Sequence, residues 1–324
     1  MTVVLENEHV ELVMDPERGG EIVRFARPGE ANGLAHYAWT TPNPPDQNIR
    51  YGSTELDWLA GYRGGWQVLF PNAGAECLVD GLPVAFHGEG SISRAQVIEQ
   101  TATSCTISIG SRLPLELTRT VRILEDSPTV QVEDAVHNIG IGPASFIWGH
   151  HPVFPLTEGS VIDAPPSTVK VEPSKAGGHL LQSGQWPRLS GQDGTWEDLS
   201  RSPGEQTERL VYLQDLPEGW AALRHPDAGS PSIAMAWDVN AYPHLWLWTL
   251  DGADGFPWYG RARMIGIEPQ RAWPFDGLKG AIDRGQALTL GPGGAQSSWF
   301  TLTLLPGGEK PVIGMDQDGT VHHD

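Results

Sequence analysis

Short segments with alternating or β-branched residues recur along the chain between clusters of turn residues, and this pattern most limits the possible folds. The clearest of them cover residues 104–110, 115–124, 129–137, 231–237 and 298–305. Such segments suit strands, because successive side chains of a strand point to opposite faces. The 39 glycines and 27 prolines supply the turns that a sandwich of many strands requires. The sequence therefore predicts an all-β protein.

Few features divide the chain into smaller units. No repeat of 20–50 residues is evident, which disfavours propellers and solenoids, and no domain boundary stands out. We therefore expect residues 1–306 to form a single β-sandwich domain. Residues 307–324 are polar and glycine-rich, and we expect them to be a poorly ordered C-terminal tail. Residues 161–204, rich in proline, glycine, serine and glutamine, have the weakest apolar period and are expected to form long loops over one face.

The charge and the apolar runs exclude some partners. The chain has 21 basic and 40 acidic residues, a net charge of -19, which disfavours binding to nucleic acid or to an anionic membrane. No apolar run approaches the ~18 residues of a membrane helix. The first residues lack the basic region and apolar core of a signal peptide, so a cytoplasmic protein is expected. Cys77 and Cys105 form no CxxC pattern, and we expect them to pack as small apolar residues.

Two adjacent histidines stand in the segment FIWGHHPVF, residues 146–154. On a strand, His150 would face the same side as Trp148, and His151 would face the opposite side, so the two could not easily share a metal ion. Pro152 restricts His151 to extended geometry and predicts a strand end that opens onto a loop or a cleft. We therefore expect one of the two histidines to pack and the other to be functional.

The segment RMIGIEPQRAWP, residues 263–274, repeats this layout around Glu268. Both segments place a glycine two residues before an ionisable residue and a proline directly after it. The glycines, Gly149 and Gly266, leave space on the face beside the polar side chain. Because burial and mutual contact can tune the pKa values of histidine and glutamate, His151 and Glu268 form a candidate acid/base pair. Two separate surface ion pairs at loop edges are the alternative.

Further polar residues lie beside glycines in residues 62–91, where a ligand could approach the backbone closely. They are Arg63, Asn72 and His87. Taken singly, Arg63 is more often a solvated loop cation, and His87 is more often a core or surface histidine. The segment PHLWLWTLDG places Trp246 and Trp248 on one face of a strand, where they could belong to the core or form a stacking surface for a sugar ring.

Together these motifs resemble those of the galactose mutarotase-like superfamily, which includes the aldose 1-epimerases and the hexose-6-phosphate mutarotases. RGGWQVLFPNAG is similar to a motif of the phosphate-sugar branch, and FHGEGS to the His-Gly motif of the family. GHHPVF resembles the His-x-x-Phe motif with the acid histidine, which aligns His151 and Phe154. GIEPQ resembles the Glu-Pro motif with the base, which aligns Glu268. The resemblance covers nearly the whole chain in order.

The resemblance implies a large antiparallel β-sandwich, called a supersandwich, with a sugar bound in an open cleft on one sheet. An ionised Glu268 would take the proton of the anomeric hydroxyl while a protonated His151 gives one to the ring oxygen. The ring opens, the bond between C1 and C2 rotates, and the reverse transfers close the other anomer. No cofactor or metal is implied. Further contacts to the sugar would come from His87, Arg63, Asn72, Trp248 and Gln270.

The sequence departs from the family in two respects. The Asp-His pair of the galactose-specific branch is missing, because His225 follows Arg224. A phosphorylated sugar would require a cluster of basic groups, which Arg63 could form only with arginines distant in the sequence, namely Arg261, Arg263 or Arg271. The sequence alone therefore does not choose between a free and a phosphorylated aldose.

Three other functions remain open from the sequence. A non-catalytic sugar-binding or sensing protein on the same fold would hold His151 and Glu268 too far apart to act on one ring. A polysaccharide lyase or hydrolase would normally need a second carboxylate beside Glu268. A metal site formed by His87, His151 and Glu268 is the third, because two histidines and a carboxylate can form a facial triad.

Overall fold

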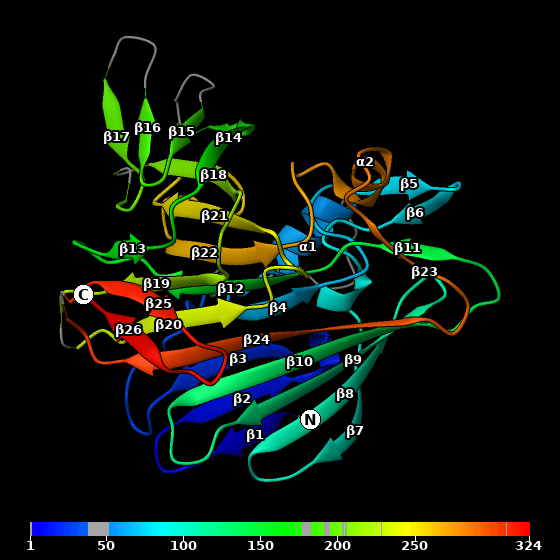
Figure 1. Ribbon diagram of the computed structural model, residues 1–324, viewed down its shortest axis with the longest axis horizontal. Coiled ribbons are helices and arrows are strands. Elements are labelled where there is room, and N and C mark those ends of the chain that lie inside the picture. The colour runs from blue at the N-terminus through cyan, green and yellow to red at the C-terminus, as the bar shows by residue number, and fades with distance from the viewer. Residues whose placement is uncertain are drawn as a thin grey trace.

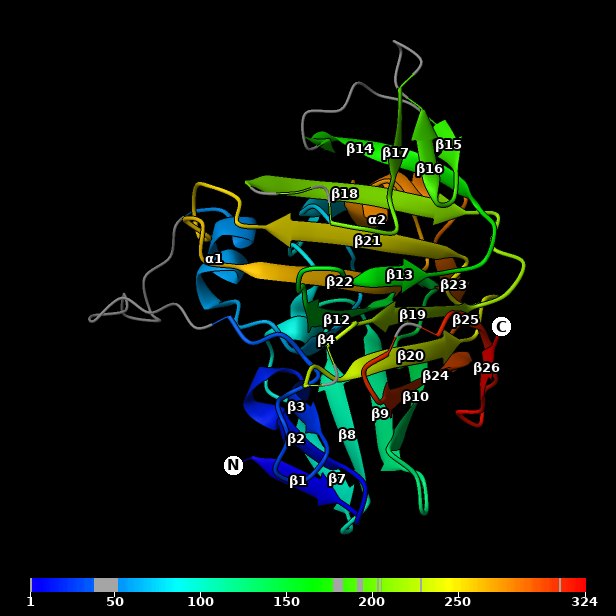
Figure 2. The ribbon, with the colours of Figure 1, turned by 90° about the vertical axis from the view of Figure 1, so that its left-hand side faces the viewer.

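The computed structural model describes residues 2–37, 52–176, 183–190, 195–202, 204, 206–227, 229–308 and 310–324. In this part of the chain, two large antiparallel sheets lie face to face (Figure 1). The larger sheet extends beyond the smaller one, toward the strands at the top of Figure 2. The all-β prediction is confirmed, and the architecture is that of a large antiparallel sandwich.

The described strands of the larger sheet number twelve. Their order in the sheet is β1 (Val3–Glu6), β2 (Glu11–Asp15), β3 (Glu21–Ala26), β4 (Trp66–Leu69), β12 (Gly149–Pro155), β22 (Arg263–Gln270), β21 (His244–Asp251), β18 (Thr207–Gln214), β14 (Thr168–Ala176), β15 (Ser183–Gln185), β16 (Arg188–Ser190) and β17 (Trp196–Asp198). Strands β12 and β22, which contain the two motifs, are neighbours near the middle of this sheet.

The described strands of the smaller sheet number eight, in the order β13 (Val161–Asp163), β19 (Trp220–Arg224), β20 (Ser232–Trp237), β24 (Ala295–Leu305), β10 (Thr129–Asn138), β9 (Leu115–Ile123), β8 (Ser104–Gly110) and β7 (Gln96–Gln100). Three strand pairs accompany the sheets: β5 (Cys77–Val79) with β6 (Leu82–Val84), β11 (Ala144–Phe146) with β23 (Leu288–Leu290), and β25 (Val312–Met315) with β26 (Val321–His323). The described helices are α1 (Thr54–Gly61), α2 (Gly277–Asp283) and the 3-10 turns Pro16–Arg18 and Glu89–Ser91.

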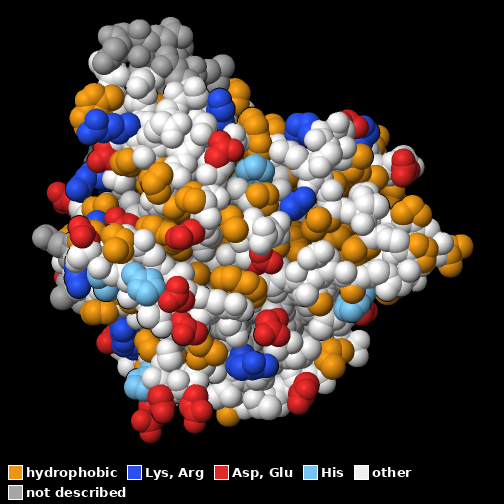
Figure 3. Space-filling view, viewed as in Figure 1, with side chains coloured by type: hydrophobic (Ala, Val, Ile, Leu, Met, Phe, Trp, Pro, Cys, Tyr) orange, Lys and Arg blue, Asp and Glu red, His pale blue; other side chains and the backbone are white. Residues whose placement is uncertain are grey.

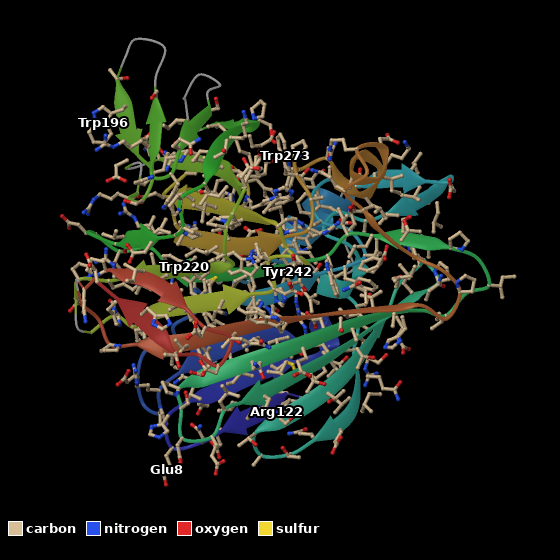
Figure 4. All side chains as sticks on the ribbon, viewed as in Figure 1. Glu8, Arg122, Trp196, Trp220, Tyr242 and Trp273 are labelled. Atoms are coloured by element: carbon tan, nitrogen blue, oxygen red, sulfur yellow. The ribbon has the colours of Figure 1, made fainter. Side chains whose placement is uncertain are left out.

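The strands that the alternating segments predict are all present. Residues 104–110 form β8, and the other four segments correspond to β9, β10, β20 and β24 with ends that shift by three residues or fewer. Strand β8 has the expected half-buried pattern, with Cys105, Ile107 and Ile109 in the core between the sheets. Figure 4 shows Tyr242 in the same interior, where its hydroxyl lies 2.7 Å from Ser298 Oγ.

The two faces of the larger sheet bury different sets of residues. Along β21, Leu245 and Leu247 belong to the core between the sheets, while Trp246 and Trp248 belong to a second apolar cluster on the opposite face. Helices α1 and α2 cover this opposite face (Figure 1). A functional side chain on the outer face of the larger sheet is therefore enclosed by aromatic residues and helices rather than by the second sheet.

The expectation of a poorly ordered tail in residues 307–324 is wrong. Strands β25 and β26 form a hairpin, and Val312 and Met315 are buried against the outer face of the smaller sheet. Ala234 and Ala236 of β20 provide space for these side chains. The Val312 N–H also donates to Asp163 Oδ2 at 3.0 Å. Val321 packs, partly buried, against the same cluster, so apolar contacts as well as hydrogen bonds hold the hairpin on the sheet.

The expectation of long loops in residues 161–204 is also wrong in part, because the described residues there include β13, β14, β15, β16 and β17. Val169 and Val171 of β14 are buried in the core. Trp196 of β17 lies at the outer edge of the larger sheet, and 61% of its surface is exposed (Figure 4).

The described part of the chain contains no helix long and apolar enough to cross a membrane. Acidic side chains are scattered over the face shown in Figure 3, with basic side chains between them and no broad basic patch on its described surface. This distribution is consistent with the net charge of -19.

Candidate active site

His151 and Glu268 lie opposite each other on neighbouring strands. Gly149 pairs with Gln270 and Val153 pairs with Gly266, so the register between these pairs places His151 opposite Glu268. His151 Nε2 lies 3.5 Å from Glu268 Oε1, and both side chains are buried. The structure brings together the two residues that the sequence singled out as a candidate acid/base pair.

The glycines of both motifs make room for polar side chains on this face. A β-carbon on Gly266 would lie 2.3 Å from Glu268 Oε1, so the carboxylate occupies the space that glycine leaves. On Gly149, a β-carbon would overlap the Gln270 side-chain amide instead of His151. The predicted use of the glycines is therefore confirmed at Gly266, whereas Gly149 serves a residue on the neighbouring strand.

The two prolines differ in their effect on the strands. β22 ends at Gln270, directly after Pro269, as expected. β12, contrary to expectation, continues from His151 through Pro152 to Pro155, and Pro152 pairs with Trp66 on β4. A proline inside a sheet leaves a ladder position without its N–H. The Gln270 Nε2 amide donates to the His150 carbonyl oxygen at 3.1 Å. This side-chain hydrogen bond lies beside Pro269, which has no N–H to contribute to the ladder.

His150 points to the opposite face of β12, as predicted, and takes part in a buried polar cluster between the sheets. Arg119 of β9 forms a bidentate ion pair with Asp134 of β10, at 2.8 and 2.7 Å. His150 Nε2 lies 3.4 Å from Asp134 Oδ2, and the Trp66 indole donates to His150 Nδ1 at 3.1 Å. His150 is thus a packing residue that connects the two sheets beneath His151.

A cavity of about 210 Å³ opens beside His151 and Glu268 on the outer face of the larger sheet. Aromatic rings line most of it: Trp58, Phe86, Trp246, Trp248, Phe256, Trp258 and Phe275. They come from separate parts of the fold, because α1 carries Trp58, β21 carries Trp246 and Trp248, and the loop before β22 carries Phe256 and Trp258. Indole and phenyl faces are suitable surfaces for the apolar faces of a sugar ring.

Two of these aromatic elements are fixed by side-chain hydrogen bonds. The Tyr37 hydroxyl donates to the Pro257 carbonyl oxygen at 2.5 Å and holds the loop that carries Phe256 and Trp258. The Trp58 indole donates to Ser91 Oγ at 3.2 Å. The wall of the cavity is thus largely formed in the protein alone, which reduces the cost of ordering it on binding.

His87 lines the cavity close to the acid/base pair. Its ring centroid lies 5.4 Å from that of His151. His87 Nδ1 accepts the Gly74 N–H at 3.1 Å, so Nε2 carries the proton and can donate to a ligand. Burial lowers the pKa of His87 well below its ordinary value, with the neighbouring His151 and Lys175 acting in the same direction. His87 is therefore a neutral hydrogen-bond donor.

Burial also favours the neutral forms of the acid/base pair. It lowers the pKa of His151 to about 4 and raises the pKa of Glu268 well above its ordinary value, which the Gln270 amide and Lys175 partly oppose. Within the pair, burial therefore favours a proton on Glu268 over one on His151. The mechanism that the resemblance implies starts instead from an ionised Glu268 and a protonated His151.

Two further polar residues line the cavity, and the sequence did not indicate them. Lys175 Nζ on β14 lies 2.6 Å from Glu208 Oε1 on β18, and the Trp248 indole donates to the same oxygen at 3.0 Å. The alternation of residues 207–214 places Glu208 on the same face as Leu210, but nothing in the sequence relates either residue to Lys175.

Three sequence candidates lie outside the cavity wall. Arg63 donates to Glu21 at 2.6 Å and to Asp15 at 2.9 Å, in an ion-pair cluster beside β3. Asn72 is fully buried and bonds the backbone of the chain through both its oxygen and its nitrogen. Gln270 holds the Glu268 carboxylate, with its Nε2 at 3.4 Å from Oε2. Of the predicted ligand contacts, the cavity wall includes His87 and Trp248 and does not include these three.

The metal alternative gains no support from the geometry. Within the described ranges, no group of three or more His, Cys, Asp or Glu side chains could hold a metal ion, and His87, His151 and Glu268 form no such group.

Comparisons with known proteins identify the fold. No known protein-family profile matches the chain, and no curated protein sequence matches it. Among solved structures, a candidate aldose 1-epimerase from Klebsiella pneumoniae has a TM-score of 0.69 at 19% identity, over 93% of this chain and 78% of that one. A second candidate aldose 1-epimerase, from Escherichia coli K12, has a TM-score of 0.65 at 18% identity, over 94% and 99%.

A galactose mutarotase related enzyme from Lactobacillus acidophilus gives a similar result, with a TM-score of 0.64 at 16% identity, over 94% of this chain and 97% of that one. The likeness covers both sheets, which the resemblance of the motifs had predicted. The chain therefore has the galactose mutarotase-like fold.

Proposed function

We propose that this protein is an aldose 1-epimerase, or mutarotase, which interconverts the α and β anomers of an aldose by acid/base ring opening. The observation that carries the proposal is the contact of His151 Nε2 with Glu268 Oε1 at 3.5 Å, inside a cavity lined by aromatic rings. The reaction requires two proton transfers, at the anomeric oxygen and at the ring oxygen, which are close neighbours on one sugar. Two ionisable groups at this separation can serve both atoms.

The proton of the pair is available for this chemistry. In the protein alone, burial favours this proton on Glu268 over His151, because it raises the pKa of Glu268 and lowers that of His151. An anomeric hydroxyl that donates to Glu268 stabilises the carboxylate, and the proton can pass to His151. Glu268 then takes the hydroxyl proton as a base, and His151 gives its proton to the ring oxygen as an acid. Rotation about C1–C2 and the reverse transfers complete the reaction, and no group other than these two needs to change its protonation state.

The surrounding residues suit the binding of a pyranose. The donor Nε2–H of His87 lies beside the pair and can bind an oxygen of the sugar. Trp248, whose ring centroid lies 5.8 Å from that of His151, provides an apolar face. Gln270 lies outside the cavity wall and positions Glu268 through the contact of its Nε2 with Glu268 Oε2. The proposed roles are thus acid and base for His151 and Glu268, ligand contacts for His87 and Trp248, and positioning for Gln270.

The test is anomer exchange measured by NMR on glucose, galactose, glucose 6-phosphate and several pentoses. We expect exchange above the spontaneous rate for at least one sugar. Glu268→Gln, which keeps the shape and removes the base, should lower this rate by about 10²-fold or more. Gln296→Glu, a change on the exposed end of β24, is the matched control and should leave the rate unaltered.

Two outcomes would contradict the proposal. One is an absence of acceleration for every sugar while binding is still detected by chemical-shift changes, which would indicate a binding or sensing protein. The other is acceleration that persists in Glu268→Gln, which would place the chemistry elsewhere.

A further inference from the structure

The charges in the cavity are unevenly distributed. Of its described lining residues, Lys175 is the only lysine or arginine, whereas Glu55, Glu208 and Glu268 are carboxylic acids. The ammonium group of Lys175 is in contact with Glu208, at 2.6 Å, so its charge is largely balanced within the protein. His87, the remaining donor near the pair, is neutral because it is buried. The cavity therefore presents no unbalanced positive charge among its described groups.

The arginines that could have formed a phosphate site are engaged or placed elsewhere. Arg63 binds Asp15 and Glu21. Arg271 donates to the carbonyl oxygens of Gln286 and Asn240. Neither of them is part of the described cavity wall, and the same holds for Arg261 and Arg263.

We propose that the cavity selects uncharged sugars over phosphorylated or carboxylated ones, and that the Lys175–Glu208 ion pair determines this specificity. The inference rests on the proposed function and narrows its substrate class. A phosphate monoester carries about -1.5 to -2 charges at pH 7 and binds through charge-assisted contacts with cations. Lys175, the one lysine or arginine of the described cavity wall, is already paired with Glu208. The negative charge of Glu208 also repels an anion. A sugar hydroxyl, in contrast, can donate to Glu208 and accept from Lys175 at little electrostatic cost.

Glu208 is well placed to keep this arrangement rigid. The carboxylate oxygen that binds Lys175 also accepts the Trp248 indole N–H at 3.0 Å. Trp248 in turn contacts the ring of His151. The ion pair and the acid/base pair line the same cavity and are connected through one aromatic side chain, so a sugar that contacts both would bind its hydroxyls to the ion pair and its anomeric centre to the acid/base pair.

The experiment releases Lys175 from its partner. Glu208→Gln removes the negative charge but keeps an oxygen that can accept the Trp248 N–H. The probes are 1-deoxyglucose and 1-deoxyglucose 6-phosphate, which lack the anomeric hydroxyl and cannot undergo ring opening, so binding is measured separately from catalysis. Dissociation constants come from NMR titration at low ionic strength, where such charge effects are strongest.

The wild-type protein should bind the neutral probe at least about tenfold more tightly than the phosphorylated one, a difference of about 1.4 kcal/mol. Glu208→Gln should improve binding of the phosphorylated probe relative to the neutral probe by about tenfold. The double variant Lys175→Met/Glu208→Gln should lose this relative gain, because no lysine or arginine then remains in the described cavity wall.

The inference would be overturned if the wild-type protein bound the phosphorylated probe as tightly as the neutral one, or more tightly. It would also be overturned if Glu208→Gln did not lower the dissociation constant of the phosphorylated probe relative to that of the neutral one. Selective binding of the neutral probe in a protein that does not accelerate anomer exchange would support the inference and refute the proposed function alone.

Discussion

Gly266 offers a way to displace the candidate base without altering its chemistry. In Gly266→Ala the new β-carbon would lie 2.3 Å from Glu268 Oε1, whereas ordinary carbon–oxygen contacts begin near 3.4 Å. The carboxylate must therefore move by about 1 Å, because the backbone of a central strand yields less readily than a side chain. The present separation of 3.5 Å between Glu268 and His151 would then change.

The expected effect is large on the rate and moderate on stability. A misplacement of about 1 Å at a reacting group can lower the rate by about 10²-fold. The extra methyl group should lower the free energy of unfolding by about 1–3 kcal/mol. Anomer exchange by NMR gives the rate, and chemical denaturation followed by circular dichroism gives the stability. The same sugar and the same temperature should be used for both proteins.

Gly110→Ala is the matched control, since Gly110 also lies in a strand but a β-carbon there would meet nothing within 4 Å. It should keep the wild-type rate. A folded Gly266→Ala protein with the full wild-type rate would refute the reasoning, because the position of the Glu268 carboxylate could then not matter for catalysis.

Two further predictions follow from the charges at and near the site. We expect kcat/KM to fall as pH drops through about 4, where His151 becomes protonated while Glu268 keeps its proton, and to fall again on the basic side at a pH well above the ordinary carboxyl value of 4.5, where Glu268 with its raised pKa loses its proton. A His151 imidazole that titrates near its ordinary value of 6.5 when followed by NMR would show that burial does not control the pair. Arg63→Ala should leave KM nearly unchanged but lower the free energy of unfolding by about 1–3 kcal/mol, because the substitution removes an ion-pair partner of the buried Glu21. The NMR exchange assay and chemical denaturation measure the two quantities. A sharp rise in KM with stability retained would contradict the placement of Arg63 outside the cavity.

The sequence predicted the parts of the site that depend on strand periodicity. Two-residue alternation is enough to separate His150 from His151 and to place Glu268 on the face of Gly266, and the structure has both arrangements. The sandwich was predicted from the many short strand segments between turns and from the resemblance of the ordered motifs to those of a known superfamily. The matching layout of the two segments suggested the pairing of His151 with Glu268, but their contact depends on the register between two strands more than 100 residues apart, which the sequence does not specify.

The parts that failed depend on which groups meet in three dimensions. Arg63 and Asn72 were chosen because they lie near glycines, but nearby carboxylates and backbone groups satisfy them. Lys175 and Glu208 were missed because neither belongs to a motif, and their meeting depends on the pairing of β14 with β18. The tail was misjudged because the sequence contains no sign of the alanine surface that receives Val312.

The most direct test of the central claim is a crystal structure of the protein with a bound uncharged hexose. The account predicts that the anomeric oxygen and the ring oxygen of the sugar lie within hydrogen-bond distance of Glu268 and His151, with a ring face against the aromatic wall that includes Trp248. A hexose bound outside this cavity, or bound within it with its anomeric carbon turned away from His151 and Glu268, would contradict the account.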